Sequence, residues 1–141
     1  MELKEVTYSE VSQIQCKVFH GASGDRKHIV VMQFIGKYRD GCLGNPDAAF
    51  MDMMVTAALT AWEPSAAIID LSQLNYVWGD MLEMIFPDDA GELGPRGLPS
   101  ALVVGEECRE AIRTLIFGVN GTESLSEVAW VHESLDDALS T

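Results

Sequence analysis

The residues that could carry out chemistry are few and scattered along this chain of 141 residues. Cys42, in the stretch DGCLGN, is a candidate nucleophile, with His20 or His28 as the base that would take its proton. Asp70 ends an apolar run, at a place where open α/β sheets often hold ligands. The spacing requires neither arrangement, because solvated histidines and an aspartate that accepts backbone hydrogen bonds in a turn account for the same residues.

Motifs that cradle phosphate or expose a catalytic serine are absent, since the chain holds no GxGxxG, GxxxxGK[ST] or GxSxG. Cys16, Cys42 and Cys108 lie far apart without a CxxC or a His-rich pair, so we expect reduced thiols and no zinc site. Asp88 and Asp89 could hold a divalent cation weakly, although a solvated loop is the simpler interpretation. We therefore expect no catalytic residue, no cofactor and no metal.

Charge is the unusual property of the composition. The chain has 22 Asp and Glu against 9 Lys and Arg, a net charge of −13. Ten acids and no Lys or Arg occupy residues 40–93, and no Lys or Arg follows Arg113. Such a chain should repel nucleic acid and anionic membranes and could attract a basic partner, although solubility alone would also explain the charge.

The sequence carries no feature of a secreted or membrane-spanning protein. Its start, MELKEVTYSEVSQIQ, lacks the apolar run of a signal peptide. No later stretch approaches the roughly 20 apolar residues that a bilayer requires. We expect a cytoplasmic protein.

The first half of the chain predicts a hairpin followed by a long helix. Residues 10–19 alternate in polarity, and the β-branched run HIVVMQFIGKY follows a glycine-containing turn. Asn45 as N-cap and Pro46 in the first turn predict a helix that ends near Trp62. Its three methionines could form a pliable partner surface, but core filling is the more usual role of such residues.

The second half alternates between short apolar runs and helical segments. The predicted strands cover 66–71, 100–105 and 127–131, and the predicted helices cover 79–86, 106–118 and 135–139. The order β-β-α-β-α-β-α-β-α predicts a single α/β domain, with its core at about residues 10–140. We expect a mixed, mostly parallel sheet of about five strands with an N-terminal hairpin and four helices.

This order, together with three passages, resembles the STAS domain of sulfate transporters and anti-sigma-factor antagonists. The passages are AAIIDLSQLNYV, ALVVGEECREAIRTLIFG and VAWVHESLDDAL. The resemblance implies a non-catalytic interaction domain. In bacterial members a partner kinase phosphorylates a serine at the start of the second helix. Here that position falls on Gly79, within Trp78-Gly79-Asp80-Met81, so the phosphoacceptor hydroxyl is missing.

The corner at Trp78-Gly79-Asp80-Met81 is the predicted partner-binding site, with acids Glu83, Asp88 and Asp89 beside it. Asp80 would be stabilised at a helix N-terminus whatever its role, or it could be a fixed charge where relatives place a switchable one. Gly79 could serve a positive φ or a close approach. Trp78 would anchor a partner if exposed and would be core if buried.

Three functional hypotheses follow. The first is a regulatory protein-interaction domain that resembles anti-sigma-factor antagonists, with a kinase or a sigma-factor regulator as partner. The alternative is an acidic inhibitor or immunity-type protein that binds a basic toxin or nuclease. The third is a small-molecule-binding or enzymatic α/β domain. A homodimer through the edge of the hairpin is also compatible with the sequence.

Overall fold

Five strands form one mixed sheet in the computed structural model, which describes residues 1–22, 27–87 and 93–140. The strands are β1 (Gln15–Ala22), β2 (His28–Lys37), β3 (Ala66–Asn75), β4 (Ser100–Val103) and β5 (Val131–His132). They lie in the order β1-β2-β3-β4-β5, with β1 antiparallel to β2 and every later pair parallel. The predicted single α/β domain with an N-terminal hairpin is therefore confirmed.

Helices connect the strands, and their lengths differ greatly. The α-helices are α1 (Tyr8–Val11), α2 (Asn45–Trp62), α3 (Arg109–Phe117) and α4 (Leu135–Leu139). The 3-10 helices are η1 (Gly41–Gly44), η2 (Asp80–Ile85), η3 (Pro95–Gly97) and η4 (Leu125–Glu127). None of the helices in the described ranges is long and apolar enough to cross a membrane.

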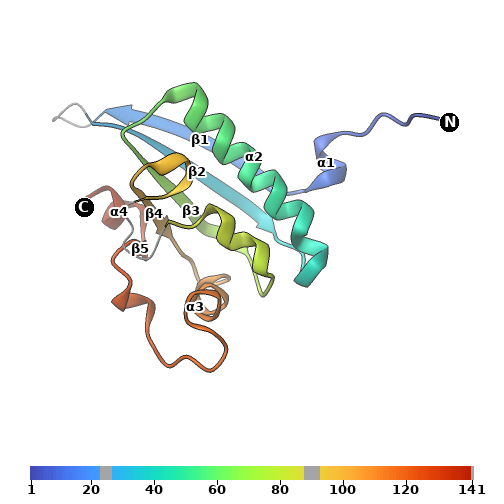
Figure 1. The fold of residues 1–141 in the computed structure, drawn as a ribbon. Coiled ribbons are helices and arrows are strands. Elements are labelled where there is room, and N and C mark those ends of the chain that lie inside the picture. The colour runs from blue at the N-terminus through green and yellow to red at the C-terminus, as the bar shows by residue number, and fades with distance from the viewer. Residues whose placement is uncertain (23–26, 88–92, 141) are drawn as a thin grey trace.

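The main core lies between one face of the sheet and the helices that cross it. Figure 1 shows α2 running along this face, with η2 in yellow-green beside its N-terminal half. The buried side chains of α2, η2 and α3 that meet alternate residues of the strands include Met51, Val55, Leu59, Leu82, Ile85 and Ile112. Parallel strands added in one direction by right-handed crossovers place their connecting helices on the same face, which explains this one-sided core.

The second face of the sheet carries a smaller apolar cluster beneath α4. Val31, Ile68 and Val103 meet Ala138 of that helix there. An apolar groove of about 410 Å³ remains between α4 and the hairpin, where Phe19 is exposed.

The start of the chain differs from the prediction of a strand over 10–19. Residues 8–11 form α1 instead, because Thr7 begins an S/T-x-x-E capping box in which the backbone N–H of Thr7 donates to Glu10 Oε2 at 2.8 Å. The alternation itself was read correctly, since Ser12 and Ile14 are buried while their neighbours are exposed.

The later elements depart from their predicted bounds for local reasons. The strand predicted at 127–131 begins only at Val131, because Ser124 and Glu127 form a second capping box that turns the chain into η4. The predicted 79–86 helix is the 3-10 helix η2. The N-cap of α2 is Gly44, which places Asn45 inside the helix.

The strand β3 is four residues longer than predicted, and its pairing with β2 contains an irregularity. The β2–β3 register shifts between Gln33 and Ile35, and beyond the shift pairing continues to Asn75. Asp70 Oδ1 accepts the backbone N–H of Ser72 at 2.9 Å within this irregularity. The continuation carries β3 to the corner that holds the predicted site.

Candidate functional site

The corner after β3 is built on a glycine with a positive φ. Gly79 has φ 144° and is the N-cap of η2, a conformation that side-chain-bearing residues rarely adopt. A Cβ on Gly79 would lie 3.1 Å from Tyr38 Cε1 and 3.3 Å from the carbonyl oxygen of Gly41. Both expected reasons for a glycine at this position, a positive φ and a close approach, therefore apply.

Two buried tyrosines, Tyr38 and Tyr76, pack against the backbone of this corner. Tyr38 and Tyr76 pack edge to face, with ring centroids 5.0 Å apart, and the Tyr76 hydroxyl donates to the carbonyl oxygen of Gly79. Burial, followed by the charges of Asp47 and Asp80, raises the pKa of Tyr38 to about 12. Burial likewise raises the pKa of Tyr76, so both phenols stay neutral near neutral pH. Tyr38 contributes packing, and Tyr76 contributes packing and the hydrogen bond to Gly79.

Trp78 is exposed rather than buried. Its side chain lies over η1, because a Cβ on Gly41 would meet Trp78 Cη2 at 2.5 Å. The backbone N–H of Gly41 also donates to the carbonyl oxygen of Trp78 at 3.1 Å. The indole is thus held against the loop after β2 while 61% of the residue remains accessible.

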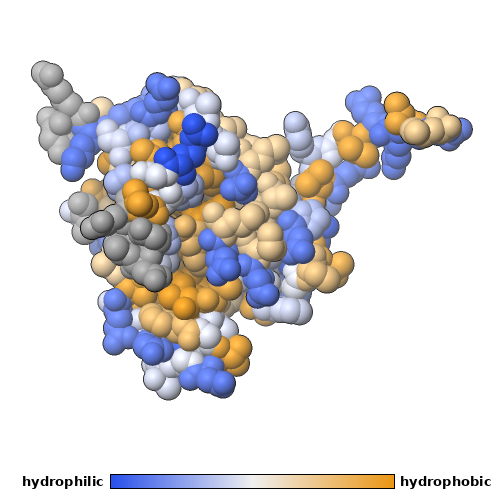
Figure 2. Space-filling model, viewed as in Figure 1, coloured by the Kyte–Doolittle hydropathy of each residue, from blue (hydrophilic) through white to orange (hydrophobic). Residues whose placement is uncertain are grey.

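Trp78 belongs to a larger exposed apolar area, which we call the Trp78 surface. Its members come from η1, the β3–η2 corner and η2, and they are Leu43, Val77, Trp78, Met81 and Met84. Figure 2 shows apolar side chains gathered between α2 and η2, with hydrophilic ones along their borders. Exposed aromatic and methionine side chains in one area are typical of interaction surfaces.

An acid-lined groove adjoins the Trp78 surface. The groove has a volume of about 300 Å³ and is lined by Tyr76 and Val77 on the β3 side and by Glu106, Glu107 and Glu110 beside α3. The backbone N–H of Tyr76 donates to the carbonyl oxygen of Glu107 at 3.1 Å, which fixes the two sides. We call it the glutamate groove. Val77 belongs to both this groove and the Trp78 surface.

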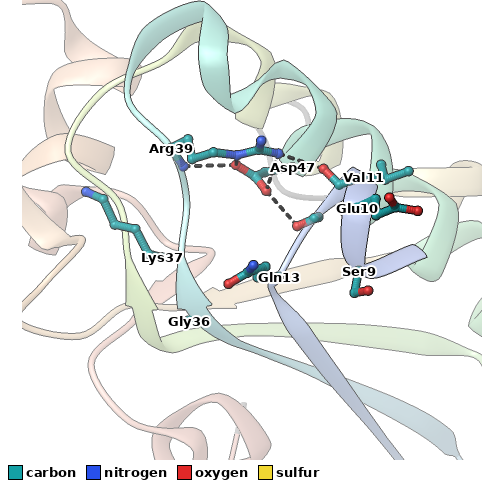
Figure 3. A pocket seen from close by; sticks show the side chains of 9 residues that line it. Ser9, Glu10, Val11, Gln13, Gly36, Lys37, Arg39 and Asp47 are labelled. Carbon is teal, nitrogen blue, oxygen red and sulfur yellow. Dashed lines mark hydrogen bonds and ion pairs between the residues drawn. The ribbon is translucent and has the colours of Figure 1, made fainter. Parts of the chain in front are cut away.

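A second groove, of about 800 Å³, lies between α1 and the start of α2 (Figure 3). Asp47, 1% exposed, stands at its wall and accepts hydrogen bonds from the backbone N–H and Nε of Arg39, both at 2.9 Å, and from the Ser12 hydroxyl at 2.6 Å. Arg39 Nη2 donates to the carbonyl oxygen of Val11 at 2.6 Å. We call this network the Arg39–Asp47 clamp, because it connects α1 to α2. The bonds occupy the acceptor oxygens of Asp47 and leave little capacity for a ligand.

The clamp has a definite charge state. Burial on its own raises the pKa of Asp47, but the hydrogen bonds from Arg39 and Ser12 outweigh burial and hold this pKa below its usual value. The carboxylate is therefore ionised whenever the protein is near neutral pH, and the Arg39–Asp47 pair stays intact there.

The candidate groups for nucleophilic catalysis are not brought together. His28 begins β2 and Cys42 follows its end, so the length of the strand, about 30 Å at ~3.3 Å per residue, separates them. His20 lies beside His28, with Nδ1 and Nε2 3.3 Å apart, and stacks on Trp62.

Asp70 is a buried hydrogen-bond acceptor, and of the other two cysteines Cys16 is partly buried and Cys108 is buried. Asp70 is 3% exposed and accepts from Gln33 Nε2 at 3.1 Å, well before the end of β3, so the position predicted from the sequence was wrong. Burial raises the pKa of the Cys16 thiol to about 11 and raises that of Cys108 as well. Neither thiol is therefore suited to act as a nucleophile near neutral pH.

The structure brings the first five predicted site residues together. Trp78, Asp80, Met81 and Glu83 are exposed around buried Gly79. Asp88 and Asp89 lie outside the described residues. Sequence reasoning missed Leu43, Val77, Met84, Glu106, Glu107 and Glu110. One signal could have pointed to the glutamates, because the carboxyl ends of neighbouring parallel strands meet at the same edge of a sheet.

The chain matches no protein-family model and no curated protein sequence.

Proposed function

We propose that this chain is a non-catalytic, cytoplasmic protein-interaction domain with a regulatory role, and that it binds its partner through the Trp78 surface. The observation that carries the proposal is the exposure of Trp78, which lies over Gly41 next to Gly79, the residue against which two buried tyrosines pack. Tryptophan is enriched among residues that dominate binding energy, and here it lies on a rigid corner rather than on a free loop.

The resemblance to anti-sigma-factor antagonists supports the same proposal. In that family the corresponding corner contacts a kinase or another regulator. No residue from Val77 to Met84 carries a hydroxyl, so a phosphorylation switch has no acceptor at this corner. The corner instead carries the permanent charges of Asp80 and Glu83, which makes constitutive rather than switched binding the expected behaviour.

The test compares the proteins retained by wild-type chain and by variants from a lysate of the source cell. We expect Trp78→Ala and Asp80→Lys each to reduce retention of the specific partner at least about tenfold, the effect of losing one central interface residue. Trp62→Ala is the matched control, because Trp62 is also partly exposed but stacks on His20 at the far end of α2. If both corner variants retain every partner as well as Trp62→Ala does, the Trp78 surface is not the binding site.

The charge of −13 and the glutamate groove favour one alternative, an acidic inhibitor or immunity-type protein that binds a basic toxin or nuclease. Electrostatic complementarity of that kind speeds association and weakens with added salt. The association rate of the retained partner, measured at low and at high ionic strength, tests this alternative. An inhibitor's basic target should show faster association at low salt, whereas an association rate independent of salt would contradict the alternative.

A further inference from the structure

The acids around the Trp78 surface are not neutralised within the chain. They come from η2 and from the turn before α3, and they are Asp80, Glu83, Glu106 and Glu107. Across residues 1–22, 27–87 and 93–140, no ion pair involves any of these four carboxylates. This side of the molecule therefore presents uncompensated negative charge next to exposed apolar side chains.

The nearest cations along the chain are already engaged. Arg109 donates Nε to Glu133 Oε1 at 3.2 Å and a further hydrogen bond to Glu133 Oε2. Arg113 pairs with Glu110 at 2.7 Å and also donates to the carbonyl oxygen of Gly121 at 3.0 Å. Arg113 therefore neutralises Glu110, one of the three glutamates of the groove, whereas among the described residues no cation pairs with Glu106 or Glu107, which leaves those two carboxylates for a cation of another molecule.

The position of Val77 joins the apolar and acidic areas into one surface. Its side chain is exposed in the Trp78 surface and lines the glutamate groove. A ligand that covers Trp78 and Val77 therefore reaches Glu106 and Glu107 without leaving the protein surface. Its chemistry must be apolar at one end and cationic at the other.

The elements that form the Trp78 surface favour a helical ligand over an added strand. The side chains of the Trp78 surface come from η1, the β3–η2 corner and η2, and none of these is a strand. The edge strand β1 belongs to the N-terminal hairpin. Strand addition needs a free strand edge, whereas an amphipathic helix needs only an apolar surface for its apolar face. Exposed methionines adapt to such helices because their side chains are flexible and polarisable.

We infer that the Trp78 surface and the glutamate groove together bind a cationic amphipathic helix of a partner protein. The helix packs its apolar face on Trp78 and Met81, and it places a Lys or Arg in the groove between Glu106 and Glu107. The inference rests on the proposed function and adds the chemistry of the partner. A nucleic acid or an anionic membrane would meet like charge at the same surface.

The probe for the test is a synthetic peptide of Leu and Lys at helical spacing, about five turns long. Two comparison peptides keep its length: one has the same composition in a scrambled order, and the other has Glu in place of Lys. Isothermal titration with the full chain gives each dissociation constant at fixed ionic strength. We expect the amphipathic Leu–Lys peptide to bind at least about tenfold more tightly than either comparison peptide.

Paired variants separate a specific groove from general attraction to an acidic protein. Glu106→Gln with Glu107→Gln changes the net charge by the same amount as Glu2→Gln with Glu5→Gln, and all four side chains are exposed. We expect the first pair to weaken binding about fivefold or more and the second pair less than twofold. Equal weakening by the two pairs, or no preference for the amphipathic Leu–Lys peptide, would overturn the inference.

Titration of the Trp78→Ala variant with the same peptide distinguishes failure of the inference from failure of the proposed function. If Trp78→Ala weakens binding of the helical peptide but Glu106→Gln with Glu107→Gln does not, the cationic partner is wrong and the Trp78 surface stands. If Trp78→Ala leaves both peptide binding and partner retention unchanged, the proposed function fails together with the inference. Circular dichroism of each variant confirms that the fold is intact.

Discussion

At the residue scale, the corner depends on two glycines that bring aromatic rings against the backbone. Gly41 has φ 59° and lets the indole of Trp78 lie over it, while Gly79 has φ 144° and lies against Tyr38. Each close approach removes the space that a Cβ would need. The exposure of Trp78 is therefore a consequence of backbone geometry, because the loop beneath the ring holds it at the surface.

Replacing Gly79 with alanine tests this support. We expect Gly79→Ala to lower the free energy of unfolding by about 1–3 kcal/mol, since the new Cβ combines an unfavourable φ with contact against Tyr38. Urea denaturation measures the change. Gly21→Ala is the control, because Gly21 has no atom within 4 Å of a built Cβ and no positive φ. Equal stability of the two variants would show that Gly79 is not constrained.

At the element scale, the Arg39–Asp47 clamp connects α1, the end of β2 and the start of α2. Arg39 precedes η1, the loop on which Trp78 rests, so the clamp also fixes the base of the candidate site. The pKa of Asp47 is lower in the folded chain than the unfolded value of about 3.9. A lowered pKa contributes stability above the unfolded value and loses it as the pH falls through the folded value.

Removing the carboxylate should weaken both stability and its dependence on pH. We expect Asp47→Asn to lower the free energy of unfolding at pH 7 by about 1–3 kcal/mol, because the donors of Arg39 and Ser12 lose their charged acceptor. Below about pH 4, the difference from the wild type should shrink as Asp47 of the wild type becomes protonated. Denaturation curves over this pH range measure both effects.

The control for the clamp is another aspartate with a single exposed partner. Asp40 pairs with Lys37 at 3.1 Å, and both side chains are about half exposed. Asp40→Asn should change stability by less than about 1 kcal/mol at pH 7. If Asp47→Asn behaves like Asp40→Asn, the buried network does not hold α1 and α2 together.

The elements also show what could be predicted from the sequence. The helix predicted from Pro46 to about Trp62 agrees with α2 to within one residue, because a proline at its start and Glu63-Pro64 at its end give local signals. The short helices α1 and η4 were not predicted. Apolar alternation predicted strands over 10–19 and 127–131, but a capping box begins a helix at each place. Local polarity alone could not show which of these two signals would prevail.

The candidate site was predictable only in part, for a different physical reason. The corner at 78–81 follows from the order of strands and helices. The exposure of Trp78 depends on Gly41, which lies far away in the sequence, and the glutamate groove depends on a hydrogen bond between Tyr76 and Glu107. Contacts between distant segments carry no periodic signal, so neither feature could be derived from one sequence.

At the scale of the whole molecule, stability should be unevenly distributed across the sheet. The two central strands, β2 and β3, are paired with each other over most of their length and carry the main core. The last strand, β5, pairs with β4 through only two residues, Val131 and His132. Local opening costs less free energy where fewer contacts must break.

Native-state hydrogen exchange measures this distribution. We expect amides of Met32 and Ile69, in the middle of β2 and β3, to exchange only through global unfolding. The amides of β5 and α4 should show protection at least about tenfold lower. Uniform protection across the sheet would mean that the chain opens as one cooperative unit and would contradict this prediction.

The order of the strands in the sheet is also the order in which the ribosome makes them. Each strand pairs with the one synthesised just before it, from β1 through β5. Within the described sheet, each strand after β1 meets a neighbour that has already been made, so strand addition can follow the order of synthesis. A nascent chain can therefore add strands to a growing sheet as it emerges, and the surface that includes Trp78 is completed only when the turn before α3 has been made.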